Sequence, residues 1–302
     1  MRAQLKEALD LLHTGDSERI GEALAILQGT VFAFSMKVCG HREDAEDTMQ
    51  EVLLRSLSHL AKIEHPRALA VWLYTVTRNR CWRSRRKLAH APKEFLSLEQ
   101  LMPDRDELQQ LLEDKSSSPE ENASRVEEAQ FLHRAVLTLP AVYRIVLVLH
   151  DMEELDNDLV SEILGIQPGT VRVRLHRARL AVRKAMALLL QGHSPDWTKP
   201  VRSARKKNRK QDDRNLECRS IFNNLSELLD HRIKQPSCAQ IEQHIQSCPP
   251  CVAFLKDLSH AIDRCRRFEV EGYEQLNVQL GNLLVAEYLR LTKSVSAETD
   301  RQ

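Results

Sequence analysis

The chain has 302 residues, of which only nine are glycine, 5% are aromatic and 29% are charged, and its net charge is +1. The scarcity of glycine argues against glycine-rich phosphate loops, and no common nucleotide-binding or hydrolase motif is present. The composition therefore predicts an all-α fold and excludes a β-sandwich. Ile145–Leu149 is among the longest strictly apolar runs and is far shorter than a membrane span of about 20 residues. The N-terminus lacks the features of a signal peptide, so we expect a soluble, cytoplasmic protein.

Charge is segregated along the chain despite the small net value. Lysines and arginines gather without acids in residues 78–87, 172–184 and 199–210, whereas acids gather in residues 43–51, 99–128 and 151–162. Ordinary solvated helix faces would mix both signs. Clusters of one sign create local positive fields, which predict a polyanionic partner.

Residues 1–90 are predicted to be helical. After His41, apolar residues recur at helical spacing up to Leu60. Asp44 is expected as the N-cap of this helix, with two more acids in its first turn. Another helix is expected to begin at Pro66 and to place Trp72 in the core. Residues 91–128 show little periodicity and are predicted to be a linker.

Residues 129–190 are predicted to contain a helix-turn-helix. Residues 155–164 form the first helix, Gly165–Pro168 the turn, and residues 169–190 the second helix. The second helix has a continuous apolar face, and its arginines, Arg179 and Arg183 included, are expected to lie off that face towards solvent or phosphate. This arginine density favours a DNA-reading helix over an ordinary hairpin with a basic surface.

Two motifs resemble bacterial extracytoplasmic-function sigma factors. Asp44–Val52 reads D-A-E-D-T-M-Q-E-V and is similar to the signature of sigma region two. Leu139–Arg144 and Gly165–Arg179 are similar to the start and the recognition helix of sigma region four. The motifs occur in the family's order, and the resemblance covers residues 20–190. It implies a factor without catalytic activity of its own, with core RNA polymerase and promoter DNA as partners.

The resemblance also implies roles for individual residues. Binding to polymerase falls to Asp44, Glu46, Asp47, Gln50 and Glu51. Binding to the −10 element falls to Arg78, Asn79, Trp82, Arg83, Arg85 and Arg86, with Trp82 as the stacking candidate. Binding to the −35 element falls to Thr170, Arg172, Arg174, His176, Arg177 and Arg179.

A basic linker at residues 191–215 leads to a cysteine-rich segment at residues 216–302. Cys218, His244, Cys248 and Cys251 have a spacing that suits one tetrahedral Zn²⁺, and Cys238 and His231 are rival ligands. The spacing resembles zinc-binding anti-sigma domains. A linker of this length spans roughly 25–30 Å and gives a millimolar effective concentration. We therefore expect an intramolecular contact that inhibits the sigma domains.

Two other functions remain open from the sequence. One is a DNA-binding transcriptional regulator that uses only the helix-turn-helix, against which the motif at Asp44–Val52 argues. The other is a thiol- or metal-responsive sensor, because zinc-bound thiolates can oxidise.

Overall fold

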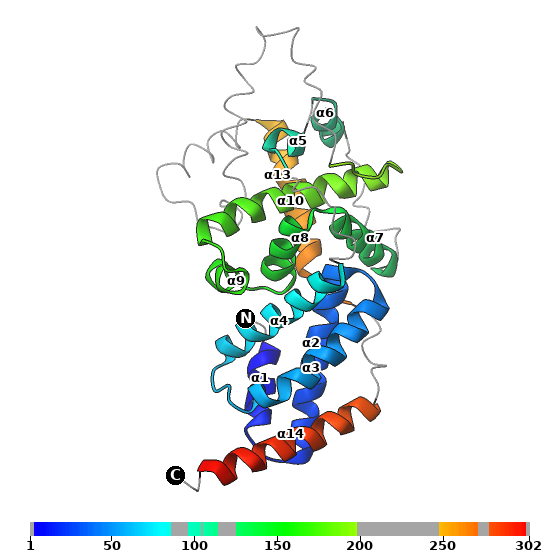
Figure 1. Ribbon diagram of the computed structural model, residues 1–302. Helices are drawn as coiled ribbons and strands as arrows, with labels where there is room; N and C mark the ends of the chain where they lie inside the picture. The colour runs from blue at the N-terminus through cyan, green and yellow to red at the C-terminus, as the bar shows by residue number, and fades with distance from the viewer. Residues whose placement is uncertain are drawn as a thin grey trace. The chain divides into compact units, whose positions relative to one another are not determined.

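The computed structural model describes residues 3–85, 96–103, 105–113, 125–197, 248–270 and 278–299. Every regular element in these ranges is a helix, which confirms the all-α prediction (Figure 1). The elements are α1 (Ala3–Leu12), α2 (Ser17–Cys39), α3 (Arg42–Leu60), α4 (Pro66–Arg85), α5 (Leu98–Leu101), α6 (Arg105–Glu113), α7 (Arg125–Thr138), α8 (Ala141–Leu147), the π-helix η3 (Val148–Met152), α9 (Asn157–Leu164), α10 (Pro168–Leu190), α13 (Pro249–Arg266) and α14 (Val278–Thr299).

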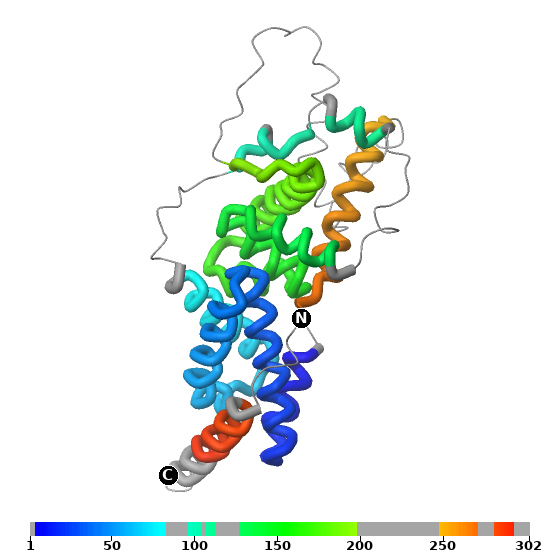
Figure 2. The backbone as a smooth tube through the Cα atoms, turned by 90° about the vertical axis from the view of Figure 1, so that its right-hand side faces the viewer, coloured from blue at the N-terminus to red at the C-terminus, as the bar shows by residue number. Residues whose placement is uncertain are grey.

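The helices form two compact units. The first unit comprises residues 1–91, 148–171 and 268–302, and the second comprises residues 92–147 and 172–267. Residues 148–171 thus belong to the first unit, although the sequence analysis groups them with residues 129–190. The backbone trace can be followed in Figure 2, where the first unit includes both the blue N-terminal helices and the red C-terminal helix α14.

The first unit is built around α2. This helix is N-capped by Asp16 and ends at Gly40, which adopts the left-handed conformation that a tight reversal into α3 requires. By length and composition α2 could cross a membrane, but 67% of its most apolar window is buried. Helices α1, α3, α4 and α14 all pack against it. We conclude that the apolar character of α2 serves the core of this unit.

Helix α3 begins earlier than expected. Its N-cap is His41, without a side-chain cap, and Asp44 lies inside the first turn beside Glu43. The prediction of Asp44 as N-cap is therefore wrong. The reason is that the left-handed Gly40 ends α2 abruptly and leaves room for the new helix at once. The two acids still stabilise the helix through its dipole. The prediction that α4 begins at Pro66 is confirmed.

The second unit contains two helices that the sequence analysis missed. The segment expected as a linker holds α5, which has a capping box formed by Ser97 and Gln100, and α6, which packs against α13. These helices have four and nine residues. Elements this short give too few turns for hydrophobic periodicity to stand out.

Candidate functional site

The predicted polymerase-binding residues share helix α3. Asp47 and Gln50 are exposed, whereas Asp44, Glu46 and Glu51 are half-buried. Two of these acids are engaged in ion pairs. Arg42 binds Glu46 at 2.7 Å, and Arg55 at 3.0 Å and Arg80 bind Glu51. The carboxylate of Asp47 is thus the most accessible charge of the set.

An exposed apolar side chain extends this surface. Leu54 is 47% exposed and lies seven residues after Asp47, which places both on one helical face with Gln50. Leu54 is not among the predicted site residues, although its position off the stripe formed by Met49 and Val52 indicates that it is exposed. We call Asp47, Gln50 and Leu54 the α3 face. An apolar residue beside an acid suits a protein partner.

The predicted −10 residues lie at the end of α4. Asn79 and Trp82 are exposed, and the Arg78 guanidinium lies 5.3 Å from the Trp82 ring centroid. Arg78 is half-buried because it also donates a 2.7 Å hydrogen bond to the Ile163 carbonyl oxygen of α9. Burial lowers the pKa of Arg78. The side chains of Arg83 and Arg85, and all of Arg86, lie outside the described residues.

Trp72 is half-buried and not fully in the core as predicted. Its ring stacks on His59 with a centroid separation of 5.4 Å. The stripe on α4 that is fully buried instead consists of Leu69, Leu73 and Tyr74.

The predicted helix-turn-helix is present, but its first helix begins at Asn157 instead of residue 155 and its second at Pro168 instead of residue 169. Asp156 caps α9 by accepting a 2.8 Å hydrogen bond from the backbone N–H of Leu159, and Gly165 ends α9 in the left-handed conformation. Helix α10 then begins at Pro168. Among the predicted −35 residues, Thr170 and Arg172 are exposed, and Arg174, His176 and Arg177 are half-buried. These five residues occupy the first half of α10.

Arg179 and Arg183 do not face solvent, so that expectation is wrong. Arg179 is 0% and Arg183 is 3% exposed. In the second half of α10 the buried face is wider than the apolar stripe, so it includes Arg179 and Arg183. Two carboxylates compensate for the positive charge of Arg183. Arg183 binds Glu107 and Asp257 at 2.5 Å each, and its guanidinium lies 4.5 Å from the Phe254 ring centroid. Arg183 is therefore a structural residue.

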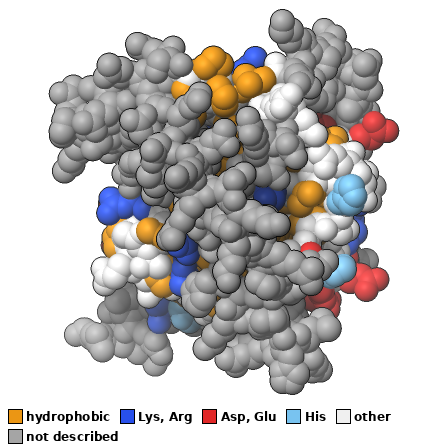
Figure 3. Space-filling view, turned by 90° about the horizontal axis from the view of Figure 1, so that it is seen from above, with side chains coloured by type: hydrophobic (Ala, Val, Ile, Leu, Met, Phe, Trp, Pro, Cys, Tyr) orange, Lys and Arg blue, Asp and Glu red, His pale blue; other side chains and the backbone are white. Residues whose placement is uncertain are grey.

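Charge segregation is also visible on the surface. In Figure 3 the visible acidic side chains lie mostly at one side of the face shown, and most of the visible lysines and arginines lie at the other.

The candidate metal centre is described in part. Cys248 and Cys251 lie at the start of α13, and their Sγ atoms are 3.4 Å apart. Two sulfurs this close on one helical turn fit a shared tetrahedral ion. Cys218, His244 and the rival ligands Cys238 and His231 lie outside the described residues, which hold no group of three candidate ligands. Cys265 is buried.

Three protein families match parts of the chain. "Sigma-70 region 2" matches residues 25–91, "Sigma-70, region 4" matches residues 131–182, and "Putative zinc-finger" matches residues 218–251. The first two matches contain the α3 face and the helix-turn-helix. The third begins at Cys218 and ends at Cys251, which suggests zinc binding in that segment.

Curated relatives agree with these matches. The ECF RNA polymerase sigma factor SigW of Bacillus subtilis is 26% identical over 186 residues, which cover 62% of this chain and 98% of SigW. The probable RNA polymerase sigma factor RfaY of Xanthomonas campestris is 31% identical over 184 residues, which cover 61% of this chain and 44% of RfaY.

A solved structure, the sigma factor RpoE in complex with the anti-sigma factor NepR from Bartonella quintana, aligns with 54% of this chain and 93% of that chain, at 19% identity and a TM-score of 0.39. A likeness this weak carries no argument. The ordered matches to regions 2 and 4 and the relation to SigW carry the assignment: the chain belongs to the sigma-70 family, as an ECF-type sigma factor with a zinc-finger segment joined to its C-terminal side.

Proposed function

We propose that this protein brings core RNA polymerase to promoters through the α3 face. The observation that carries the proposal is the exposure of Asp47, Gln50 and Leu54 on one side of a helix within the region 2 match. Glu46 and Glu51 on α3 are held in ion pairs, so Asp47 supplies the accessible charge on this face. Electrostatic complementarity would steer a basic surface of polymerase to this face.

The two basic segments would read the promoter. Asn79 and Trp82 at the end of α4 supply an exposed amide and ring for the −10 element, with Arg78 beside them. Thr170 and Arg172 at the start of α10 are accessible to the −35 element, followed by Arg174, His176 and Arg177. Polymerase would perform the chemistry, so the protein would have no catalytic residues and would act in the cytoplasm.

The polymerase surface can be tested by a single charge reversal. Asp47→Lys should weaken binding of the full chain to core RNA polymerase by at least about tenfold, since one reversed charge at an interface costs several kcal/mol. Asp10→Lys is the matched control, because Asp10 is an exposed acid on α1 of the same unit. Equal binding by both variants, with unchanged helical circular dichroism, would show that the α3 face is not the contact.

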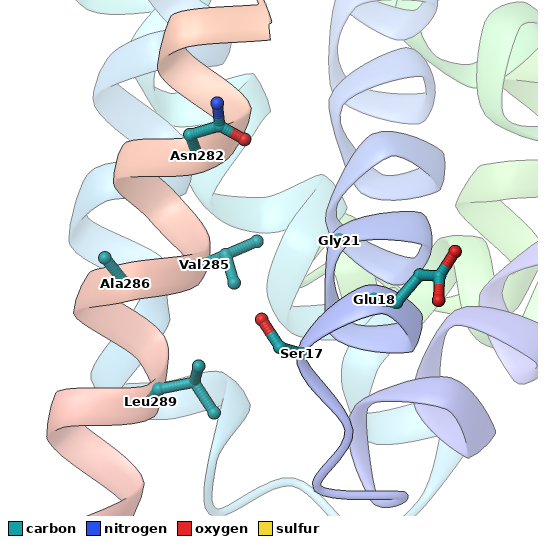
Figure 4. A pocket seen from close by; sticks show the side chains of 7 residues that line it. All are labelled: Ser17, Glu18, Gly21, Asn282, Val285, Ala286 and Leu289. Atoms are coloured by element: carbon teal, nitrogen blue, oxygen red, sulfur yellow. The ribbon is translucent and has the colours of Figure 1, made fainter.

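The C-terminal segment would regulate this activity within the same chain. Its helix α14 packs on α2 and α3 in the first unit, where Leu284 and Tyr288 are buried. Val285 approaches to 3.7 Å of the position that a Cβ atom at Gly21 would take. An open groove of about 550 Å³ remains between α2 and α14. Figure 4 shows the side chains that line it. Region 2 therefore already carries a helix from the far end of the chain.

The other C-terminal helix, α13, packs within the second unit. Arg264 of α13 binds Glu128 of α7 at 2.7 Å, and Asp257 binds Arg183 of α10. The cysteines at the start of α13, with Cys218 and His244, would hold one Zn²⁺ and so fix the N-terminus of this helix. Helix α14 thus contacts the region 2 match, and α13 contacts Arg183, which directly follows the region 4 match.

We expect this regulation to be inhibitory. Truncation after Leu190 and truncation after Arg214 should both raise the output of a promoter reporter at equal protein levels. Lower output from both truncations would make the segment an activator or a stabiliser. If only the shorter protein lost activity, the basic linker would be the functional element.

A further inference from the structure

One exposed apolar side chain lies among the cationic residues of helix α10. Val173 is 52% exposed, and its neighbours in the sequence are Arg172, which is exposed, and Arg174, which is half-buried. Val171, two residues earlier, is 0% exposed and belongs to the core. The resemblance to sigma factors assigns no role to Val173. The two valines therefore lie on different sides of the helix, and only Val173 is accessible to a partner.

Helical spacing places Val173 on one face with two other side chains that can contact DNA. His176 and Arg177 follow it by three and four residues, so they are its neighbours along the helix surface. Arg172 lies four residues before His176 and borders the same face. These residues occupy the N-terminal half of α10. Val173 is thus an apolar group in the middle of a polar, arginine-rich face.

Neither core packing nor helix stability accounts for a valine at this position. At 52% exposure the side chain leaves much of its apolar surface in water. Valine is also a poorer helix former than arginine, lysine or alanine, because its branched Cβ restricts χ1. Single exposed apolar residues are common on protein surfaces, but this one lies within the set of residues proposed to contact the −35 element. An apolar group there suits a partner that presents both phosphates and apolar atoms.

The major groove of duplex DNA has both kinds of group. Its base edges carry hydrogen-bond donors and acceptors, and the apolar group among them is the C5-methyl group of thymine. The groove is about 12 Å wide and admits an α-helix, and the N-terminal residues of a recognition helix reach the base edges. Arginines on the same helix can bind the phosphates on either side. A valine in the middle of such a face would contact the bases.

The chemistry of valine selects thymine over the other bases. Its side chain has neither a hydrogen-bond donor nor an acceptor, so it gains contact only with another apolar group. Opposite cytosine it would cover the N4 amino group, and opposite a purine it would cover N7 and the neighbouring O6 or N6 atom. A polar group that is buried without a hydrogen bond costs free energy. Valine therefore favours thymine both by attraction and by excluding the alternatives.

We propose that Val173 is a specificity-determining residue that reads the C5-methyl group of one thymine in the −35 element. The proposal rests on the proposed sigma function, because it needs α10 to lie in the major groove. It extends that function by naming a base and the group on that base that is recognised. The arginines would fix the helix on the DNA, and Val173 would add the selection of one base pair.

Selection from a pool of randomised DNA duplexes tests the proposal, with the full chain bound to core RNA polymerase. The parent should enrich thymine at one position that Val173 contacts. Val173→Ser should lose the preference at that position and keep the preferences elsewhere, because the arginines are unchanged. Leu190→Ser is the matched control, since Leu190 is an apolar residue at the other end of α10 and is 66% exposed. This control should select the same sequence as the parent.

Deoxyuridine then removes the methyl group alone. Replacing the selected thymine by deoxyuridine should lower the affinity of the parent about fourfold, as expected for the burial of one methyl-sized group. The affinity of Val173→Ser should not change with the same replacement. An unchanged thymine preference in Val173→Ser would overturn the proposal, and so would an equal loss with deoxyuridine in both proteins.

Two further outcomes separate this proposal from the function on which it rests. If Val173→Ser loses selection at every position, the proposal is overturned, because the residue would then act on the helix as a whole. If the parent itself selects no sequence, the proposed promoter function is overturned, and the thymine contact with it.

Discussion

Lys37 and Arg183 are both buried cations that join distant parts of the chain, but their partners differ. Lys37 binds Glu153, whose side chain is 0% exposed, and the Tyr74 hydroxyl donates a hydrogen bond to the same carboxylate. Arg183 binds Glu107 and Asp257, whose side chains remain 20% and 39% exposed. One cation is therefore paired fully inside the first unit, and the other is paired at the edge of the second.

The difference predicts how each contact responds to damage. A carboxylate that keeps access to water loses little when its cation is removed, because solvent compensates for the charge. A carboxylate or ammonium group sealed in the interior cannot be compensated in this way without opening the structure. We therefore expect the loss of Glu153 to lower the free energy of unfolding more than the loss of Arg183 does.

The largest effect should come from the proposed zinc centre. This centre lies at the start of α13, the helix that carries Asp257, which is one of the two partners of Arg183. Cys248→Ser should abolish the binding of about one zinc ion per chain, since structural zinc contributes about 10–16 kcal/mol in small zinc-finger peptides. Residues 215–265 should then become sensitive to protease, because α13 carries Asp257 and begins at this cysteine.

Cys265→Ser is the control for the zinc experiment, since Cys265 is a buried cysteine of the same helix outside the proposed ligand set. It should retain zinc. Metal analysis that finds no zinc in the parent, after purification under reducing conditions without chelators, would remove the site.

Next in size is the loss of the partner of Lys37. Glu153→Ala should lower the free energy of unfolding by up to about 3–5 kcal/mol, because Lys37 would be left buried without its counterion. Urea denaturation measures the change, and a loss below that of an exposed pair would contradict the burial argument.

Arg183→Met should have a smaller effect of about 1–2 kcal/mol by the same method. Its two carboxylate partners stay partly solvated, and the methionine retains apolar contact with Phe254. A loss equal to that of Glu153→Ala would show that partner exposure does not distinguish the two cations.

The smallest effect belongs to Arg42→Met. Arg42 and Glu46 are as close as Lys37 and Glu153, at 2.7 Å, but their side chains are 49% and 35% exposed. Exposed pairs of this spacing contribute less than about 0.5 kcal/mol. This variant isolates burial from distance as the cause of the difference.

The helices and motifs with strong local signals could be predicted from the sequence. Pro66, Gly165 and Pro168 set helix boundaries through their own backbone preferences, and the structure has these boundaries. The prediction of Asp44 as the N-cap is wrong because a good capping residue does not decide a boundary that Gly40 has already set.

The buried charges could not be predicted from local patterns. Periodicity assigns an arginine or lysine to the solvent side, and it has no means of detecting a carboxylate 74 residues away for Arg183 or 116 residues away for Lys37. The same limit hid the α4–α9 contact, which places Arg78 against a carbonyl group of a distant helix. Such pairings are tertiary and become visible only once the fold brings the helices together.

Run-off transcription with purified core RNA polymerase tests the central claim most directly. The full chain, added to core polymerase and a library of promoter fragments, should produce discrete transcripts that core polymerase alone does not produce. Specific DNA binding without polymerase binding or transcripts would contradict the account and would favour a helix-turn-helix regulator instead.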